Sequence, residues 1–147
     1  MFIRKNVVLL AVLLILLPSI LHGKDYRCVI SYHPPPFHYS QWTIEVYRDK
    51  KQYFIASANI PGLKQKAGID RENYLSFIKK MNKMGIWRLQ DYYHSDSSNA
   101  YFLVSASDKN YSNTFRIEEN VTYPGLKANY IEIIRTFKNY ARIFLEK

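Results

Sequence analysis

The stretch with the clearest potential for chemistry is "SYHPPPFHYSQW", residues 31–42, in which His33 and His38 flank three prolines. Two histidines can share a zinc ion when each brings a ring nitrogen within about 2.1 Å of it. A proline run favours polyproline II, which rises about 3.1 Å per residue and holds these backbones on the order of 15 Å apart. No third ligand stands nearby in the sequence. We therefore interpret the stretch as a rigid crossover that ends one strand and starts the next, and expect no metal and no other cofactor.

A second polar cluster, "DYYHSDSSN" at residues 91–99, contains Asp91, His94 and Asp96. These side chains are suited to acid–base work or to binding a divalent ion. Their spacing matches no calcium or zinc pattern, and Ser, Asp and Asn are residues that favour turns. The favoured interpretation is a solvent-exposed loop. The alternative is a small secreted hydrolase-like enzyme that uses His94 with Asp91 or Asp96.

Motifs for nucleophilic catalysis are absent from the sequence. There is no G-x-S-x-G elbow and no glycine-rich phosphate loop, and the five glycines form no run. Catalytic triads assemble from distant residues, so this absence does not exclude an enzyme. It favours a non-catalytic domain with a binding or envelope-associated role, and we assign no catalytic residue.

The N-terminus has the pattern of a secretory signal. Arg4 and Lys5 precede an apolar run from Val7 to Leu17, and a basic start followed by an apolar run of about 7–15 residues is typical of export. A transmembrane helix needs about 20 apolar residues. We predict an export signal at 1–23 and one mature domain at 24–147, secreted or periplasmic. The alternative is an uncleaved anchor, which is the only membrane attachment that we expect.

Charge and cysteine content narrow the choice of partners. Setting aside Arg4 and Lys5 leaves 19 basic against 12 acidic residues, a net charge of +7. Such a charge favours anionic partners, namely a membrane surface, an acidic polysaccharide or nucleic acid. The preferred interpretation is a solvated basic surface, because the lysines are scattered or sit on helix faces and form no run of five or more. We expect an unidentified protein or an anionic surface as partner, and nothing in the sequence indicates specific nucleic-acid binding. Cys28 is the only cysteine, so no disulfide forms within the chain. Its alternating segment "YRCVISY" predicts a buried small side chain in a strand.

An internal repeat organises the rest of the chain. Each copy contains an Asp-Lys pair between two strand-like runs, then "PGLK", then an amphipathic helix. The first copy has seven more residues between "PGLK" and its helix than the second. We interpret the chain as two strand–strand–helix units. The matching segments are Asp49 and Lys50 with Asp108 and Lys109, residues 61–64 with 124–127, and residues 73–81 with 129–137.

Two helices are expected from apolar residues that recur every three or four positions. Asp70 is placed to cap the first helix and Gly85 to end it. The first stripe consists of Tyr74, Phe77, Ile78 and Met81, and the second of Tyr130, Ile133, Ile134, Phe137, Tyr140, Ala141 and Phe144.

The strands alternate, and we expect one face of each to point toward the helices. That face is expected to hold Trp42, Ile44, Val46, Phe54, Ala56, Ala58, Phe102, Val104, Ala106, Phe115 and Ile117. The predicted fold is α+β: an antiparallel sheet of about four to five strands with two helices packed on one face.

The sheet face away from the helices is the predicted binding surface. Alternation places Thr43, Glu45, Tyr47, Tyr53, Ile55, Ser57, Tyr101, Leu103, Ser105 and Arg116 there, and aromatic residues and arginine are enriched at contact surfaces. We single out Tyr47, Tyr53, Tyr101 and Arg116 as binding residues. The competing interpretation is that residues 24–40 fold across this face and make it interior.

Overall fold

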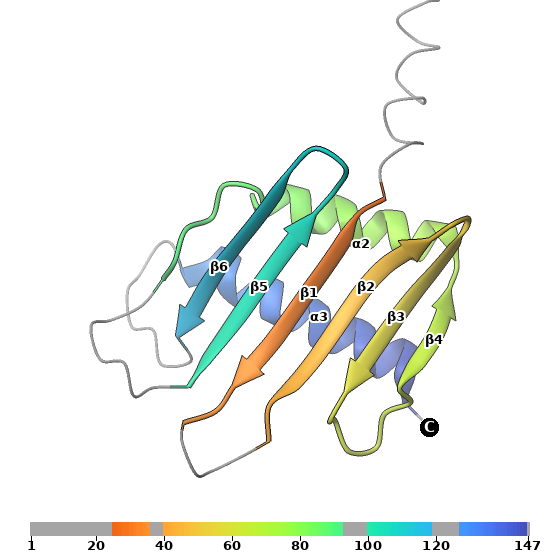
Figure 1. Ribbon diagram of the computed structural model, residues 1–147, viewed down its shortest axis with the longest axis horizontal. Helices are drawn as coiled ribbons and strands as arrows, with labels where there is room; N and C mark the ends of the chain where they lie inside the picture. The colour runs from red at the N-terminus through yellow and green to blue at the C-terminus, as the bar shows by residue number, and fades with distance from the viewer. Residues whose placement is uncertain (1–24, 36–39, 93–99, 119–126, 147) are drawn as a thin grey trace, which may run out of the picture.

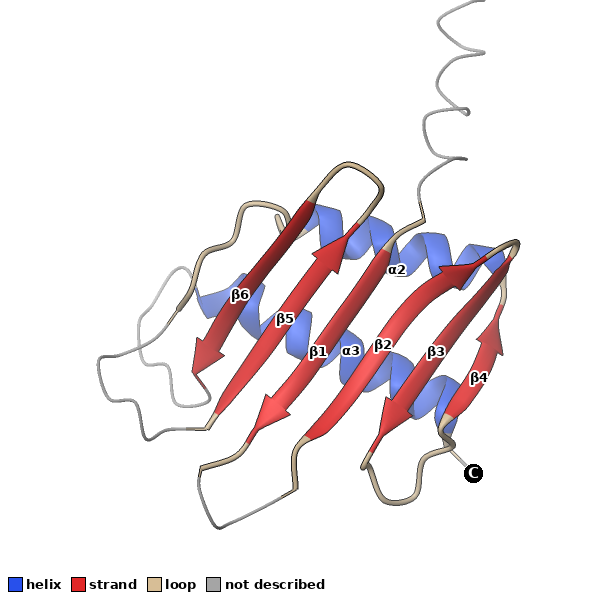
Figure 2. Ribbon diagram, viewed as in Figure 1, coloured by secondary structure: helices blue, strands red, loops and turns tan. Residues whose placement is uncertain are grey.

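The computed structural model describes residues 25–35, 40–92, 100–118 and 127–146. Within them the chain forms an α+β fold with a six-stranded antiparallel sheet and two helices (Figures 1 and 2). The α+β class was predicted, but the expected number of strands was too low. The elements are β1 (Arg27–His33), β2 (Trp42–Asp49), β3 (Gln52–Ala58), β4 (Lys66–Ile69), α2 (Arg71–Lys83), β5 (Tyr101–Ser107), β6 (Ser112–Glu118) and α3 (Lys127–Leu145).

The strand order is β4-β3-β2-β1-β5-β6, so the first strand in the chain lies in the middle of the sheet. β1 pairs with β2 on one side and with β5 on the other, and both pairings are antiparallel. It therefore joins the β2–β3–β4 meander to the β5–β6 hairpin. Because residues 27–33 are a sheet strand, the interpretation in which residues 24–40 cover the open face is wrong for this part of the segment.

The proline-rich stretch links two neighbouring strands. β1 ends at His33, β2 begins at Trp42, and Tyr32 pairs with Trp42 across the two strands. The predicted strand end and strand start are confirmed, and the two strands are adjacent in the sheet. Residues 36–39, which include His38, lie outside the described residues.

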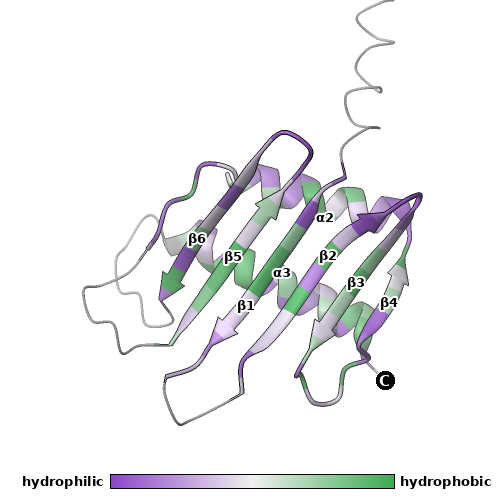
Figure 3. Ribbon diagram, viewed as in Figure 1, coloured by the Kyte–Doolittle hydropathy of each residue, from purple (hydrophilic) through white to green (hydrophobic). Residues whose placement is uncertain are grey.

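Both Asp-Lys pairs lie at hairpin turns, as predicted. In the β2–β3 turn Asp49 pairs with Gln52, and Lys50 adopts a φ of 55°. In the β5–β6 turn the Asp108 carboxylate accepts hydrogen bonds from the backbone N–H groups of Asn110 and Tyr111. Figure 3 shows hydrophilic residues at both turns.

The extra residues of the first unit form β4, the strand that the sequence analysis missed. It pairs with β3 at the edge of the sheet. The second "PGLK" lies mostly outside the described residues. The internal repeat therefore stays a prediction.

Helix α2 begins and ends where the sequence indicates. The Asp70 carboxylate accepts a hydrogen bond of 2.8 Å from the backbone N–H of Asn73, which satisfies a donor that the first helical turn leaves free. Gly85, just beyond the helix, has a φ of 78°, a left-handed conformation that glycine adopts without steric cost. The buried residues of this helix are the four predicted, Tyr74, Phe77, Ile78 and Met81.

Both helices lie on the same side of the sheet in Figure 1. Their aromatic rings contact one another and those of the strands. Phe77 of α2 contacts Phe137 of α3 edge to face at 5.1 Å between ring centroids. Tyr53 of β3 contacts Tyr74 of α2 at 4.6 Å. The core between these elements is rich in Ile, Phe and Tyr side chains.

The predicted face of β3 was wrong. Ile55 is fully buried and pairs with Val46, which also faces the helices. Phe54 pairs with Tyr47 and therefore lies on the open face. The segment "YFIASAN" is apolar on both sides, so alternation alone does not indicate which side is interior.

Candidate functional site

Of the four predicted binding residues, three lie on the open face and one does not. Tyr47, Tyr101 and Arg116 are half-buried residues whose cross-strand partners share that face. Tyr53 lies on the helix-facing side, where its ring contacts Tyr74. The placement of Tyr53 on the open face is therefore corrected.

Three of the open-face side chains form a stack near one end of the sheet. The rings of His33 and Tyr101 are 4.6 Å apart and nearly parallel, and the Arg116 guanidinium lies 3.9 Å from the centre of the Tyr101 ring. Burial, and secondarily the charge of Arg116, lower the pKa of His33 below its ordinary value. The stack therefore favours a neutral imidazole.

The other side of the open face carries a second aromatic group. Tyr47 and Phe54 contact each other at 5.5 Å, and the Lys66 ammonium lies 3.9 Å from the centre of the Phe54 ring. Hydroxyls elsewhere on this face pair with one another, Ser31 with Thr43 and Ser105 with Thr114. The described part of this face presents aromatic rings and paired hydroxyls.

The residues of the hydrolase alternative are only partly described. The Asp91 carboxylate accepts a hydrogen bond of 2.9 Å from the backbone N–H of Arg116. The backbone N–H of the following residue, Tyr92, donates to the Arg116 carbonyl. Asp91 thus covers part of the exposed edge of β6. His94 and Asp96 lie outside the described residues. Among the residues that are described, no three His, Cys, Asp or Glu side chains gather to hold a metal ion.

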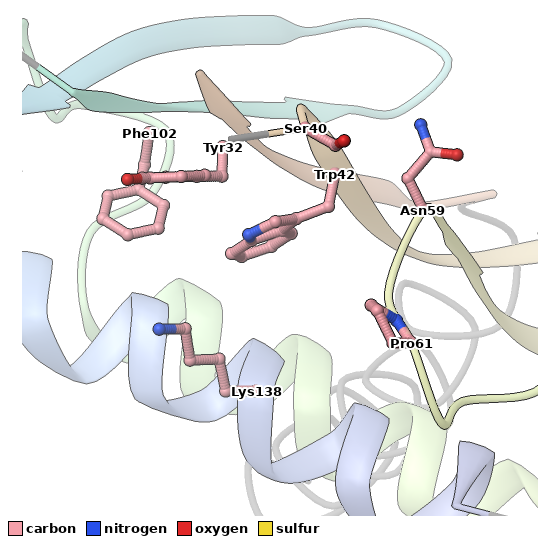
Figure 4. A pocket seen from close by; sticks show the side chains of 7 residues that line it. All are labelled: Tyr32, Ser40, Trp42, Asn59, Pro61, Phe102 and Lys138. Atoms are coloured by element: carbon pink, nitrogen blue, oxygen red, sulfur yellow. The ribbon is translucent and has the colours of Figure 1, made fainter. Parts of the chain in front are cut away.

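A cleft lies on the helix side of the sheet, between the strands and α3. We call it the aromatic cleft; it has a volume of ≈ 650 Å³, within the size range of small-molecule sites. Figure 4 shows Tyr32, Trp42 and Phe102 extending from the sheet toward α3, with Lys138 on the opposite wall. The lining residues are Tyr32, Ser40, Trp42, Asn59, Pro61, Phe102 and Lys138.

The three rings of the aromatic cleft contact one another. Tyr32 stacks on Trp42 at 5.6 Å between centroids, and Phe102 lies 5.2 Å from Tyr32 and 6.0 Å from Trp42. Tyr32 and Trp42 come from paired positions on β1 and β2, and Phe102 comes from the paired position on β5. Sheet register therefore sets all three rings side by side.

One wall of the cleft is the loop of residues 59–65, and hydrogen bonds hold it in place. The Asn59 side-chain amide donates to the Gln41 carbonyl at 3.1 Å. The Ser57 hydroxyl donates to the Lys64 carbonyl at 2.9 Å, and the Lys64 N–H donates to the Leu145 carbonyl at 2.7 Å. These bonds hold the loop against Gln41, which directly precedes β2, and against β3 and α3, so the cleft wall is preformed.

The aromatic cleft continues along α3 into a second hollow of ≈ 300 Å³. Trp42, Pro61 and Lys138 line both spaces. The remaining walls of the second hollow are mostly aliphatic, with Arg142 as its other charged residue; they are formed by Ile44, Ile60, Leu63, Ala141 and Arg142. Together the two spaces form an elongated groove with cationic side chains on one wall.

Sequence analysis did not find this site. Its rings stand on three strands and its lysine on a helix, about 100 residues along the chain from Tyr32. The usable signal was a pair of large aromatic residues, Tyr32 and Trp42, at the two ends of one loop.

Comparisons with known proteins give no further identification: no family model matches the chain, and neither do the curated proteins or the solved structures. Among the described residues, neither helix has the length and apolar character required to cross a membrane.

Proposed function

We propose that this chain is a small exported domain without catalytic activity, which binds a small apolar or aromatic molecule in the aromatic cleft. The observation that carries the proposal is the set of three mutually contacting rings around a ≈ 650 Å³ space. Small-molecule sites are typically concave, lined mainly by apolar and aromatic side chains, and largely preformed. The hydrogen-bonded 59–65 loop supplies the preformed wall.

The open face is a weaker site for a small molecule, because its rings lie on a sheet surface and its central hydroxyls pair with each other. It retains the composition of a contact surface. Tyr47, Tyr101 and Arg116 stay predicted residues for a protein partner or an anionic surface.

The export assignment rests on the N-terminal sequence pattern alone. We expect the exported protein to begin near Lys24, and N-terminal sequencing of secreted or periplasmic material tests this. An intact Met1 on exported protein would contradict it.

The two tryptophans of the chain allow a site-specific binding test. Trp42 lines the aromatic cleft, whereas the Trp87 indole N–H donates to the Asn82 side chain and its ring contacts Tyr26, away from the cleft. In a Trp87→Phe variant, fluorescence reports on Trp42 alone. Titration with 1-octanol or octanoate is expected to change that fluorescence saturably.

The matched control is Trp42→Phe, which leaves Trp87 as the only reporter. Its emission is expected to stay unchanged by the same titrations. If neither amphiphile changes the emission of Trp42, or if both tryptophans respond equally, the cleft is not the binding site and the proposed function is wrong.

A further inference from the structure

The charge around the groove is of one sign. Lys138 and Arg142 lie four residues apart on α3, so they stand on one side of the helix one turn apart. Among the residues that the structure describes, no acidic side chain lines either hollow. An uncompensated positive charge beside an apolar wall favours a ligand that carries a negative group.

Lys138 has no carboxylate partner among the described residues. Its ammonium lies 5.8 Å from the centre of the Trp42 ring and 5.6 Å from that of Phe102. Glu132, an acidic residue on the same helix, pairs instead with Arg135 at 3.1 Å. The ammonium therefore lies near the two rings, and its N–H groups can donate hydrogen bonds to a ligand.

The walls of the groove indicate the shape and polarity of the ligand. The rings form one end, and Ile60, Leu63 and Ala141 form an aliphatic continuation past Trp42. An elongated apolar chain or flat apolar body fits along these walls, with its polar end at Lys138. A concave space of ≈ 650 Å³ has the size of a site for one small molecule. We therefore infer that the ligand is a single free molecule and not a membrane surface.

We infer that the physiological ligand is an amphipathic anion, a carboxylate with an apolar body comparable to a medium-chain fatty acid, whose head group binds Lys138 while its body lies along the aromatic cleft. This inference rests on the proposed function, because it assigns the ligand class of the same site. Arg142 provides a second cation one helical turn away.

The test compares three amphiphiles of equal chain length that differ only in head group: octanoate, 1-octanol and octylammonium. Affinities are measured by the emission of Trp42 in the Trp87→Phe background. Octanoate is expected to bind about tenfold more tightly than 1-octanol, as a charge-assisted hydrogen bond at a partly exposed site provides. Octylammonium is expected to bind most weakly of the three.

Variants that remove one positive charge test which residue causes the preference for octanoate over 1-octanol. Lys138→Gln is expected to abolish the advantage of octanoate over 1-octanol, because it lowers the affinity for octanoate more than the affinity for 1-octanol. Lys79→Gln, which removes an exposed lysine of α2 that lines neither hollow, is the matched control and should keep the preference. Raising the salt concentration should narrow the preference in the wild type, because partly exposed charges are screened.

The outcomes separate this inference from the proposed function. Equal affinity for octanoate and 1-octanol, or a preference that survives Lys138→Gln, overturns the inference and leaves the binding function standing. Absence of any response overturns both. A response to vesicles of phosphatidylglycerol without a response to octanoate would show an anionic membrane surface as the ligand and overturn the inference of a free carboxylate.

Discussion

Burial decides the chemistry of Cys28. Its side chain is 1% exposed at the centre of the sheet, and burial raises the pKa of the thiol from 9.0 to about 12. A thiol with so high a pKa is almost entirely protonated at neutral pH, and the thiolate is the reactive form. The expectation of a buried small apolar side chain is confirmed.

We predict that Cys28 resists alkylation in the native protein. Iodoacetamide at pH 8 should label it slowly in buffer and rapidly in denaturant, which mass spectrometry can follow. The control is Cys28→Ala combined with Ser76→Cys, which places the only thiol on the exposed side of α2. Rapid labelling of native wild-type protein at the rate of this control would contradict the buried position.

His33 provides a pH-dependent contribution to stability. Burial, followed by the charge of Arg116, lowers its pKa in the folded state below the ordinary value of 6.5. As the pH falls below about 6.5, the unfolded chain therefore binds a proton more readily than the folded chain. The free energy of unfolding therefore decreases as the pH falls from about 6.5 to the pKa of His33 in the folded state. Above pH 6.5, His33 has little effect on stability.

This dependence can be isolated with His33→Phe, which preserves the stacking on Tyr101 and removes the titrating group. Urea unfolding between pH 5 and pH 8 is expected to show the free energy of unfolding of the wild type decreasing toward pH 5 relative to the variant. Parallel curves for the two proteins over this range would show that the folded pKa of His33 is not lowered.

At the scale of elements, sequence patterns located the helices better than the sheet. The α2 boundaries follow from the Asp70 cap and from Gly85, both local signals. β4 was missed because "KAGI" has only four residues, with a glycine and a lysine that weaken strand propensity. β3 was assigned the wrong face because both of its sides are apolar, and only pairing with β2 decides between them.

Because Ile55 faces the helices and Phe54 faces outward, we predict that truncating these two neighbours to alanine changes stability by different amounts. Ile55→Ala removes a fully buried side chain from the core and should cost about 2–5 kcal/mol of stability. Phe54→Ala removes a larger side chain from the open face and should cost clearly less. Chemical denaturation of both variants checks the order. A larger loss for Phe54→Ala would favour the face assignment made from sequence.

At the scale of the whole molecule, the candidate site arises from register and from contacts between distant segments. Tyr32, Trp42 and Phe102 become neighbours only when β1 pairs with both β2 and β5. Lys138 reaches them only when α3 lies along the helix-facing side of the sheet. The local sequence signal is limited to the pair Tyr32 and Trp42 at the two ends of one loop. The pairing of β1 with β5 and the position of α3 have no local signal, so the fold class was predictable while the cleft was not.

The central place of β1 leads to a prediction about chain length. β1 supplies hydrogen-bonded partners to both halves of the sheet and contributes Cys28 and Ile30 to the core. A chain that begins at Lys24 retains this strand and is expected to unfold cooperatively, with the same free energy as the full-length chain. A chain that begins at Pro34 lacks the strand and is expected to lose cooperative unfolding.

A milder variant, Val29→Pro, tests the same point without shortening the chain. Val29 pairs with Glu45 and Ser105 on the open face, so its side chain is not part of the core. Proline removes a backbone N–H donor and fits poorly in a central strand. Circular dichroism and urea unfolding are expected to show strong destabilisation by Val29→Pro and none by removal of residues 1–23. If the chain starting at Pro34 instead unfolds cooperatively with native-like stability, then β1 does not hold the two halves of the sheet together.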